Sequence, residues 1–248
     1  SPTPMAVVLL EDDYSPEIQA YYFRQDAWSE LRGFRLASSR RDDVDLDGLD
    51  QFPTAPVTVP EPPPEQGRKL VHGRVALLED HLHPFALEAP WRFSPARNPN
   101  PHRFRRVYRF ESRAQTIPYR RLIGRQLGNP RWSDEVRAHY LQVPDDPRYR
   151  ELAEEIVESL PRRNRGDLFA RALAIKLYLD RELTYSTRER HAEAEDPTAD
   201  MLFGNRIGYC VHFAHAAVYL FRSVGVPSRV ATGYQIPEDN RRGSTILV

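Results

Sequence analysis

The clearest helical pattern in the sequence begins at Gly208-Tyr209-Cys210-Val211-His212-Phe213-Ala214 and continues through Phe221-Arg222-Ser223-Val224-Gly225-Val226-Pro227. Apolar residues recur one turn apart after Cys210, which predicts an amphipathic helix that starts at this residue. Glycine and proline follow the last apolar turn, and both residues end helices. We therefore predict a helix from Cys210 to about residue 224.

Cys210 is the only cysteine among the 248 residues. The first turn of a helix has unpaired N–H groups and the positive end of the helix dipole, and both favour thiolate over thiol. The same N–H groups can bind an oxyanion. We interpret Cys210 as a nucleophile. The alternative is a small buried side chain, because free cysteine is among the most buried residue types.

The composition limits the classes of function. Acidic and basic residues are equally numerous, 35 of each, and the resulting net charge of +0 argues against binding of nucleic acid or an anionic membrane. No stretch is long enough to span a membrane, so we expect no direct membrane insertion of this segment. His81 and His83 would share one face of a strand, but no third ligand lies nearby, so we predict no metal site.

The first half of the chain indicates a β-rich domain, which we place at residues 1–125. Strands are predicted at Ala6–Leu10, Ile18–Phe23, Leu70–Leu78 and Arg103–Glu111. Residues 38–68 are acidic and then proline-rich, which predicts a disordered or irregular loop, because proline interrupts both sheets and helices.

The second half changes to helical periodicity. Helices are predicted at Tyr149–Leu160, Leu168–Leu183 and Thr198–Phe203, ahead of the helix that starts at Cys210. Asp167 is a suitable N-cap for the second of these helices. Ser228–Ile236 and Thr245–Val248 are expected to be strands, with a turn between them.

The residues around Cys210 resemble the transglutaminase-like superfamily, whose papain-like core performs cysteine acyl transfer. The family pattern has G-x-C near a helix start and F-A one turn later. It then has R-x-x-G-[IV]-P-x-R at the helix end and a Gly-Tyr pair on the next strand. This chain contains these elements in Gly208–Cys210, Phe213-Ala214, Arg222–Arg229 and Gly233-Tyr234. Looser similarity in the second half is to bacterial membrane proteins with an extracytoplasmic domain of this type.

The resemblance implies an α+β, cysteine-protease-like core in which helices pack on an antiparallel sheet that begins at Ser228. We place this core at residues 132–248. In the family a histidine and an aspartate follow on the two strands after the Gly-Tyr strand, so we expect the core to be truncated and these partners to lie beyond Val248. His212 and His215 lie roughly 200° and 140° around the helix from Cys210, so we do not expect either to be the base.

Three further residues are candidates for the site. Gly208 and Tyr209 precede the nucleophile, and Tyr209 is expected to pack beside it. Tyr185 is expected to line the substrate groove or to supply a second oxyanion donor. The alternative for Tyr185 is a core tyrosine with a hydrogen-bonded hydroxyl. For Arg222 and Arg229 we expect structural salt bridges or carbonyl contacts, and not substrate binding.

The resemblance implies acyl transfer or amide hydrolysis through a thioester on Cys210, with a protein or peptide as substrate and without a metal or organic cofactor. A cysteine peptidase on the same fold and a non-catalytic binding module are the alternatives. The resemblance also implies a periplasmic or cell-surface domain, tethered to the membrane by helices outside this segment.

Overall fold

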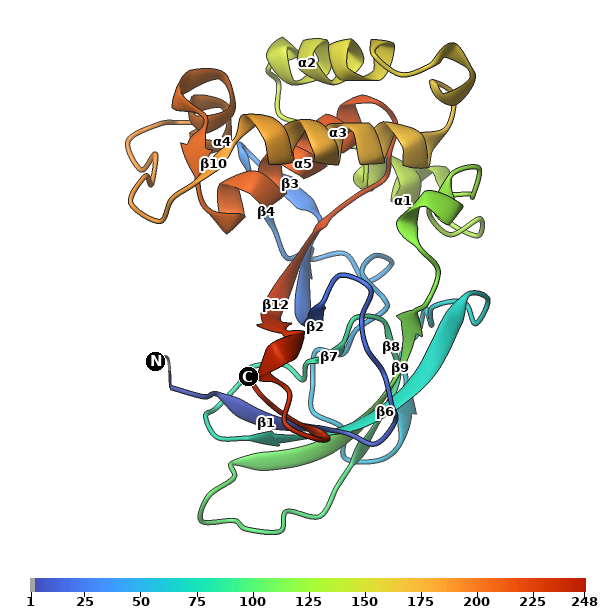
Figure 1. Cartoon of the computed structure of the whole chain (residues 1–248), viewed down its shortest axis with the longest axis vertical. Helices are drawn as coiled ribbons and strands as arrows, with labels where there is room; N and C mark the ends of the chain where they lie inside the picture. Colours follow the sequence, from blue (N-terminus) through green and yellow to red (C-terminus); the bar gives the residue numbers. More distant parts are fainter. Residues whose placement is uncertain (1–2) are drawn as a thin grey trace. The chain divides into compact units, whose positions relative to one another are not determined.

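The computed structural model describes residues 3–248 (Figure 1). Contacts between residues group them into two units, each built from stretches that are far apart in the sequence. Unit 1 comprises the segment up to Asp26, Asp45–Pro118 and Ala231–Val248, and unit 2 comprises Ala27–Val44 and Tyr119–Val230. The domains expected at 1–125 and 132–248 stay a prediction, because units defined by contacts do not show which segments fold independently.

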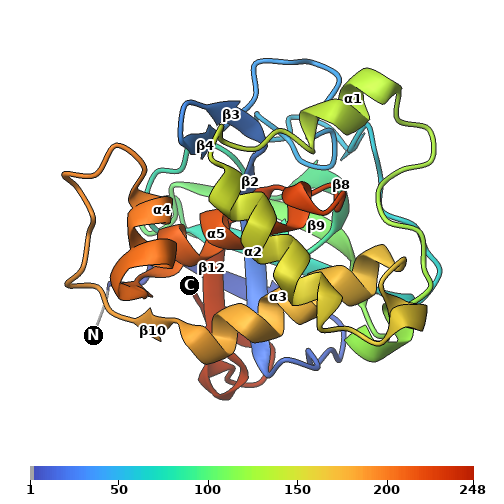
Figure 2. The same cartoon turned by 90° about the horizontal axis from the view of Figure 1, so that it is seen from above.

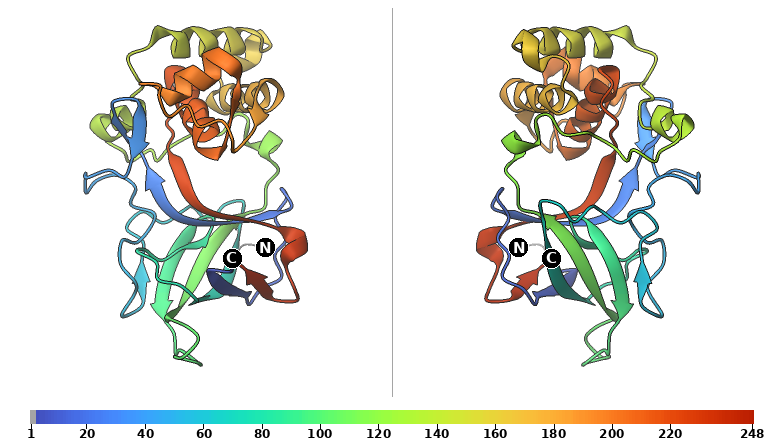
Figure 3. Two further views of the ribbon diagram at one scale, coloured as in Figure 1. Left: turned by 90° about the vertical axis from the view of Figure 1, so that its left-hand side faces the viewer. Right: turned by 90° about the vertical axis from the view of Figure 1, so that its right-hand side faces the viewer.

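Unit 1 contains a six-stranded sheet in which all strand pairs are antiparallel. Its order is β13 (Thr245–Leu247), β1 (Ala6–Leu10), β6 (Arg68–Leu77), β9 (Arg106–Gln115), β8 (Pro90–Pro95) and β5 (Val57–Thr58). The long strands β6 and β9 pair along their full length (Figure 3). Tyr108 and Phe110 of β9 point into the core, whereas Arg109 between them is exposed, as strand alternation requires.

A second sheet, most of which belongs to unit 1, has the order β12 (Val230–Pro237), β2 (Ala20–Trp28) and β7 (Ala86–Leu87). Gly233 of β12 allows a close backbone approach, because a Cβ atom at this position would overlap the carbonyl oxygen of Phe23 in β2. The core of unit 1 is aromatic, and Tyr21, Phe23 and Phe85 are fully buried in it. The stretch 38–68 is irregular apart from β5, and its Val59 is buried in this core.

Unit 2 is mainly helical. Its helices are α1 (Asp134–His139), α2 (Pro147–Glu158), α3 (Leu168–Glu182), α4 (Pro197–Asp200) and α5 (Cys210–Ser223). Helix α5 packs against α2, α3 and α4 (Figure 2). The shorter elements are β3 (Glu30–Arg32), β4 (Arg35–Ala37), β10 (Thr184–Tyr185), β11 (Ile207–Gly208), the 3-10 turns at Tyr119–Leu122 and Arg162–Asn164, and the π-helical turn η3 at Met201–Asn205.

The local signals explain where these helices begin and end. Asp167 accepts a hydrogen bond from the Ala170 N–H and caps α3, which confirms the predicted N-cap. Gly225 has φ +80° just after α5, the left-handed conformation that ends a helix and that glycine adopts without strain. The helix predicted from Cys210 is therefore confirmed at both ends.

The buried guanidinium of Arg222 holds the end of α5 in place. It donates hydrogen bonds to the carbonyl oxygens of Ser228 (2.6 and 2.9 Å), Gln142 (2.9 Å) and Ser29 (2.8 Å). The expected carbonyl contacts of Arg222 are thus confirmed.

The presence of helices together with antiparallel sheets confirms the α+β class. The strand expected from Ser228 begins at Val230 and pairs with β2, and the last strand is β13. Within residues 3–248, no helix combines the length and the apolar character needed to cross a membrane.

Candidate active site

Cys210 is the first residue of α5, and its side chain is exposed. Tyr209 before it is extended, with φ −126° and ψ −176°, so the chain enters the helix abruptly at the cysteine. Because the first N–H groups of a helix have no partner within the helix, unpaired donors and an accessible thiol lie together at this position. The structure therefore places Cys210 as the sequence predicted, at a helix start, and not in the buried position of the alternative interpretation.

The strand β11 leads directly into this helix. It pairs in parallel with β10, so that Tyr185 lies opposite Gly208, and the Ser186 N–H donates to the Gly208 carbonyl at 2.7 Å. Gly208 is tightly enclosed, because a Cβ atom there would lie 3.0 Å from both Nδ1 of His212 and Cγ of Met201. The lack of a side chain at Gly208 thus lets β11 run close to α5.

The three site-adjacent candidates lie on β10, on β11 and at the N-cap of α5. Tyr185 is 61% exposed, and its ring centroid lies 6.1 Å from that of Phe213 in α5. It is therefore not the buried core tyrosine of the alternative interpretation. The Tyr209 ring packs edge-on against His212, with centroids 4.4 Å apart. No contact in the structure tests their predicted roles toward a substrate.

His212 and His215 are buried in α5 and are bound to other groups. Nδ1 of His212 accepts from the Tyr209 N–H at 3.4 Å. Nδ1 of His215 donates to the Val211 carbonyl at 2.8 Å, and its Nε2 accepts from the Leu36 N–H at 3.1 Å. Burial lowers the pKa of both imidazoles. The His212 ring therefore stabilises the start of α5, and the His215 ring links the first turn of α5 to β4.

His191 is a residue near the site to which the sequence assigned no role. Its side chain is only 3% exposed. Nδ1 lies 2.6 Å from Oδ2 of Asp200 in α4, Nε2 lies 2.7 Å from the Ile207 carbonyl of β11, and the His212 ring centroid is 5.1 Å away. His191 lies in an irregular loop and has φ +51°, and neither periodicity nor a motif signals such contacts.

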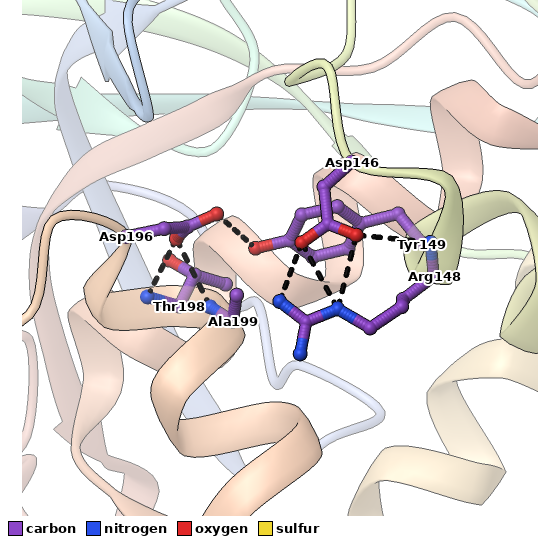
Figure 4. A network of polar contacts seen from close by, with 6 residues as sticks. All are labelled: Asp146, Arg148, Tyr149, Asp196, Thr198 and Ala199. Carbon is purple, nitrogen blue, oxygen red and sulfur yellow. Dashed lines mark hydrogen bonds and ion pairs between the residues drawn. The ribbon is translucent and has the colours of Figure 1, made fainter.

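An open pocket of about 680 Å³ lies beside α4 and the start of α2. Its lining includes the acidic residues Asp145, Asp146, Glu195, Asp196 and Asp200 and the aromatic residues Phe34 and Phe203. Three of the carboxylates are already bound. Asp200 pairs with His191. Figure 4 shows the other two: Asp146 pairs with Arg148, and Asp196 accepts from Tyr149 and from the N–H groups of Thr198 and Ala199. Among residues 3–248, no group of three or more histidine, cysteine or acidic side chains is arranged to hold a metal ion.

Comparison with known proteins identifies the part of the chain that carries this site. Residues 150–246 match the model of the transglutaminase-like superfamily. This segment is a transglutaminase-like domain. It includes α5 with Cys210, the preceding strand β11 and the following strand β12.

Two curated relatives each match a little under half of the chain. A protein-glutamine gamma-glutamyltransferase of Pseudomonas aeruginosa is 34% identical over 115 residues, which are 46% of this chain and 16% of that protein. The uncharacterized protein YebA of Bacillus subtilis is 32% identical over 110 residues, 42% of this chain and 14% of that protein. The matches thus cover about one sixth of the length of these relatives.

Two crystal structures share the fold of the whole chain. They are the periplasmic domain of TgpA from Pseudomonas aeruginosa, with a TM-score of 0.65, and the same domain bound to ethylmercury, with a TM-score of 0.64. Both are 21% identical and cover 100% of this chain, which corresponds to 80% and 81% of those chains. The likeness shows that the chain has the fold of this periplasmic domain. Together with the match to the family model, it confirms the predicted resemblance to a bacterial transglutaminase-like protein.

Proposed function

We propose that this chain carries the nucleophile of an enzyme that transfers an acyl group from an amide, through a thioester on Cys210, to an amine or to water. The observation that supports the proposal most is the position of Cys210, an exposed thiol at the first residue of a 14-residue helix. Unpaired N–H groups at that end stabilise negative charge on both the sulfur and an adjacent oxyanion.

The reaction has two halves. The Cys210 thiolate attacks the carbonyl carbon of the amide, and the negative charge that develops on the carbonyl oxygen is held by the Cys210 N–H and a second donor. The C–N bond then breaks, and the nitrogen leaves with the proton that the histidine base took from the Cys210 thiol. The thioester is next attacked by an amine, which forms a new amide, or by water, which forms an acid, and the thiol is released.

The proposal assigns the histidine base and its aspartate to residues beyond Val248, as the resemblance to the family implies. This assignment is supported by the hydrogen bonds of His191, His212 and His215. Those bonds join the ring nitrogens to groups other than Cys210. We expect the 248-residue chain by itself to lack catalytic turnover. Tyr185 is proposed to line the groove for the acyl donor, and Gly208 and Tyr209 to shape the entry to the thiol.

The relatives suggest the substrate class and the location. One relative is named a protein-glutamine gamma-glutamyltransferase, and the crystal structures are of a periplasmic domain. We therefore propose a glutamine side chain of a protein or peptide as the acyl donor. We also propose a location outside the cytoplasm, on a protein tethered to the membrane. The chemistry as proposed uses no cofactor.

The test is incorporation of a labelled primary amine into a glutamine-containing protein by the natural protein with the residues that follow Val248. We expect incorporation by the wild type and a loss of at least about 10³-fold in Cys210→Ser. Val211→Ser is the matched control, because Val211 is the exposed neighbour of Cys210, and it should stay active. Release of ammonia without incorporation would instead favour an amidase or peptidase. Equal incorporation by wild type and Cys210→Ser would contradict the proposal.

A further inference from the structure

The loop residue His191 makes two hydrogen bonds that require both of its ring nitrogens to be donors. The partners are the Asp200 carboxylate, 2.6 Å from Nδ1, and the Ile207 carbonyl, 2.7 Å from Nε2. A carboxylate and a carbonyl oxygen can only accept, and a neutral imidazole has one N–H only. The geometry is therefore that of an imidazolium, with its side chain almost fully removed from solvent.

The charged groups around His191 agree with this assignment. Asp200 faces it from α4, Glu189 from its own loop and His212 from α5. Burial lowers the pKa of His191, but the hydrogen bonds to Ile207 and Asp200 outweigh burial, so the pKa lies above its ordinary value. His212 is the uncharged member of the histidine pair, because burial and the charge of His191 both lower its pKa.

The two bonds connect the 188–196 loop to α4 and to β11, the strand that leads to the nucleophile. Asp200 ends α4, Ile207 belongs to β11, and Cys210 follows Ile207 by three residues. His212, 5.1 Å from His191 between ring centroids, accepts from the Tyr209 N–H just before the cysteine. On the side that faces the 188–196 loop, the position of the segment before Cys210 thus depends on the His191 imidazole.

We infer that His191, held as an imidazolium by Asp200, is a positioning residue that fixes β11 and the start of α5, and so makes the reactivity of Cys210 depend on pH. This inference rests on the proposed function. The direction of the pH dependence follows from the raised pKa of His191. The stabilisation by the His191 imidazolium is complete below about pH 6.5, the ordinary histidine pKa, and is lost as the pH rises through the raised pKa. Above that pH one of the two bonds is lost, because the neutral ring keeps a single proton.

The first test measures alkylation of Cys210 by iodoacetamide at pH 7 in the 248-residue chain, where this thiol is the only one. We expect Cys210 of His191→Gln to react at least about threefold more slowly than in wild type, because the thiol loses its ordered, positively charged surroundings. Access of the reagent should not change, because Cys210 is already exposed. The matched control is His72→Gln, which breaks a histidine–aspartate pair of 2.8 Å in unit 1 and should leave the rate unchanged. Equal rates for wild type and His191→Gln would overturn the inference.

The second test separates positioning from a general loss of stability. Hydrogen-exchange protection of the Ser186 and Tyr209 amides, which bond to Gly208 and His212, is followed against pH. Asp200→Asn keeps an acceptor for Nδ1 but removes the charge, so the pH at which protection falls should move down, with global stability nearly unchanged. A midpoint that does not move would overturn the inference. The proposed function fails separately, if Cys210→Ser retains amine incorporation.

Discussion

The phenol of Tyr149 in α2 donates a 2.9 Å hydrogen bond to Oδ2 of Asp196, and the other carboxylate oxygen of Asp196 caps α4. Tyr149 is fully buried, and burial together with the Asp196 carboxylate raises the pKa of its hydroxyl, so the hydroxyl stays protonated. One carboxylate therefore fixes the beginning of α4 to α2 (Figure 4).

Removal of this hydroxyl tests the contribution of the contact. We expect Tyr149→Phe to lower the free energy of unfolding by about 2 kcal/mol, because a hydrogen bond to a charged acceptor is lost without loss of the ring. Urea denaturation followed by circular dichroism measures the change. Tyr178→Phe is the control, because Tyr178 is a partly buried tyrosine of α3, and it should change stability by less than about 0.5 kcal/mol. Equal losses in the two variants would contradict the role assigned to Asp196.

The Arg222 guanidinium is predicted to be necessary for folding of unit 2. Arg222→Ala leaves three carbonyl groups without their donor, and we expect a loss of about 3–5 kcal/mol, because each buried acceptor left unsatisfied costs about 1–3 kcal/mol. Arg222→Lys should recover only part of it, because an ammonium cannot reproduce the planar fork of donors. Thermal unfolding of both variants, with exposed Arg109→Ala as control, measures this. Full recovery by lysine would show that charge alone matters.

A side chain at Gly208 is predicted to destabilise the region around Cys210. In Gly208→Ala the new Cβ meets His212 and Met201 at 3.0 Å, so β11 or α5 has to shift by a few tenths of an ångström. We expect a loss of about 1–2 kcal/mol in stability and slower alkylation of Cys210. Gly166→Ala is the matched control, because nothing lies within 4 Å of a Cβ there, and it should be neutral. The interpretation is wrong if both alanine variants behave alike.

His215 is predicted to make unit 2 sensitive to acid. Burial lowers its pKa, and its Nε2 accepts from the Leu36 N–H only when the ring is neutral. The unfolded state then binds more protons at low pH, so the stability from His215 is complete above about pH 6.5 and decreases as the pH falls below it. His215→Gln retains an acceptor without a titrating ring. Stability measured from pH 7 to 5 should fall less steeply in this variant, and an unchanged slope would exclude the assignment.

Local sequence signals predicted most of the elements of the fold. The apolar run Ala6–Leu10 was predicted as a strand and is β1, and Asp167 and Gly225 mark helix ends that the structure confirms. Such features depend on neighbouring residues only, so one sequence is sufficient to find them. The interleaving of the two units was not predictable in this way, because residues 27–44 join unit 2 through contacts with residues far along the chain, such as Leu36 with His215.

The candidate site was predicted in part. Cys210 was identifiable because a single cysteine coincided with a helix start. The two hydrogen bonds of His191 were not identifiable from the sequence, because they depend on an irregular loop, a left-handed backbone conformation and partners 9 and 16 residues away. Nor did the sequence indicate the acidic pocket, because its residues come from three separate stretches.

The most direct measurement is the rate at which iodoacetamide alkylates Cys210 at pH 7, followed by intact mass in the folded 248-residue chain. An activated thiol should react at least about threefold faster than free cysteine, because the helix start favours the thiolate. In 8 M urea, which removes the helix, the rate should return to that of free cysteine. A folded chain whose thiol reacts no faster than free cysteine would contradict the assignment of Cys210 as the nucleophile.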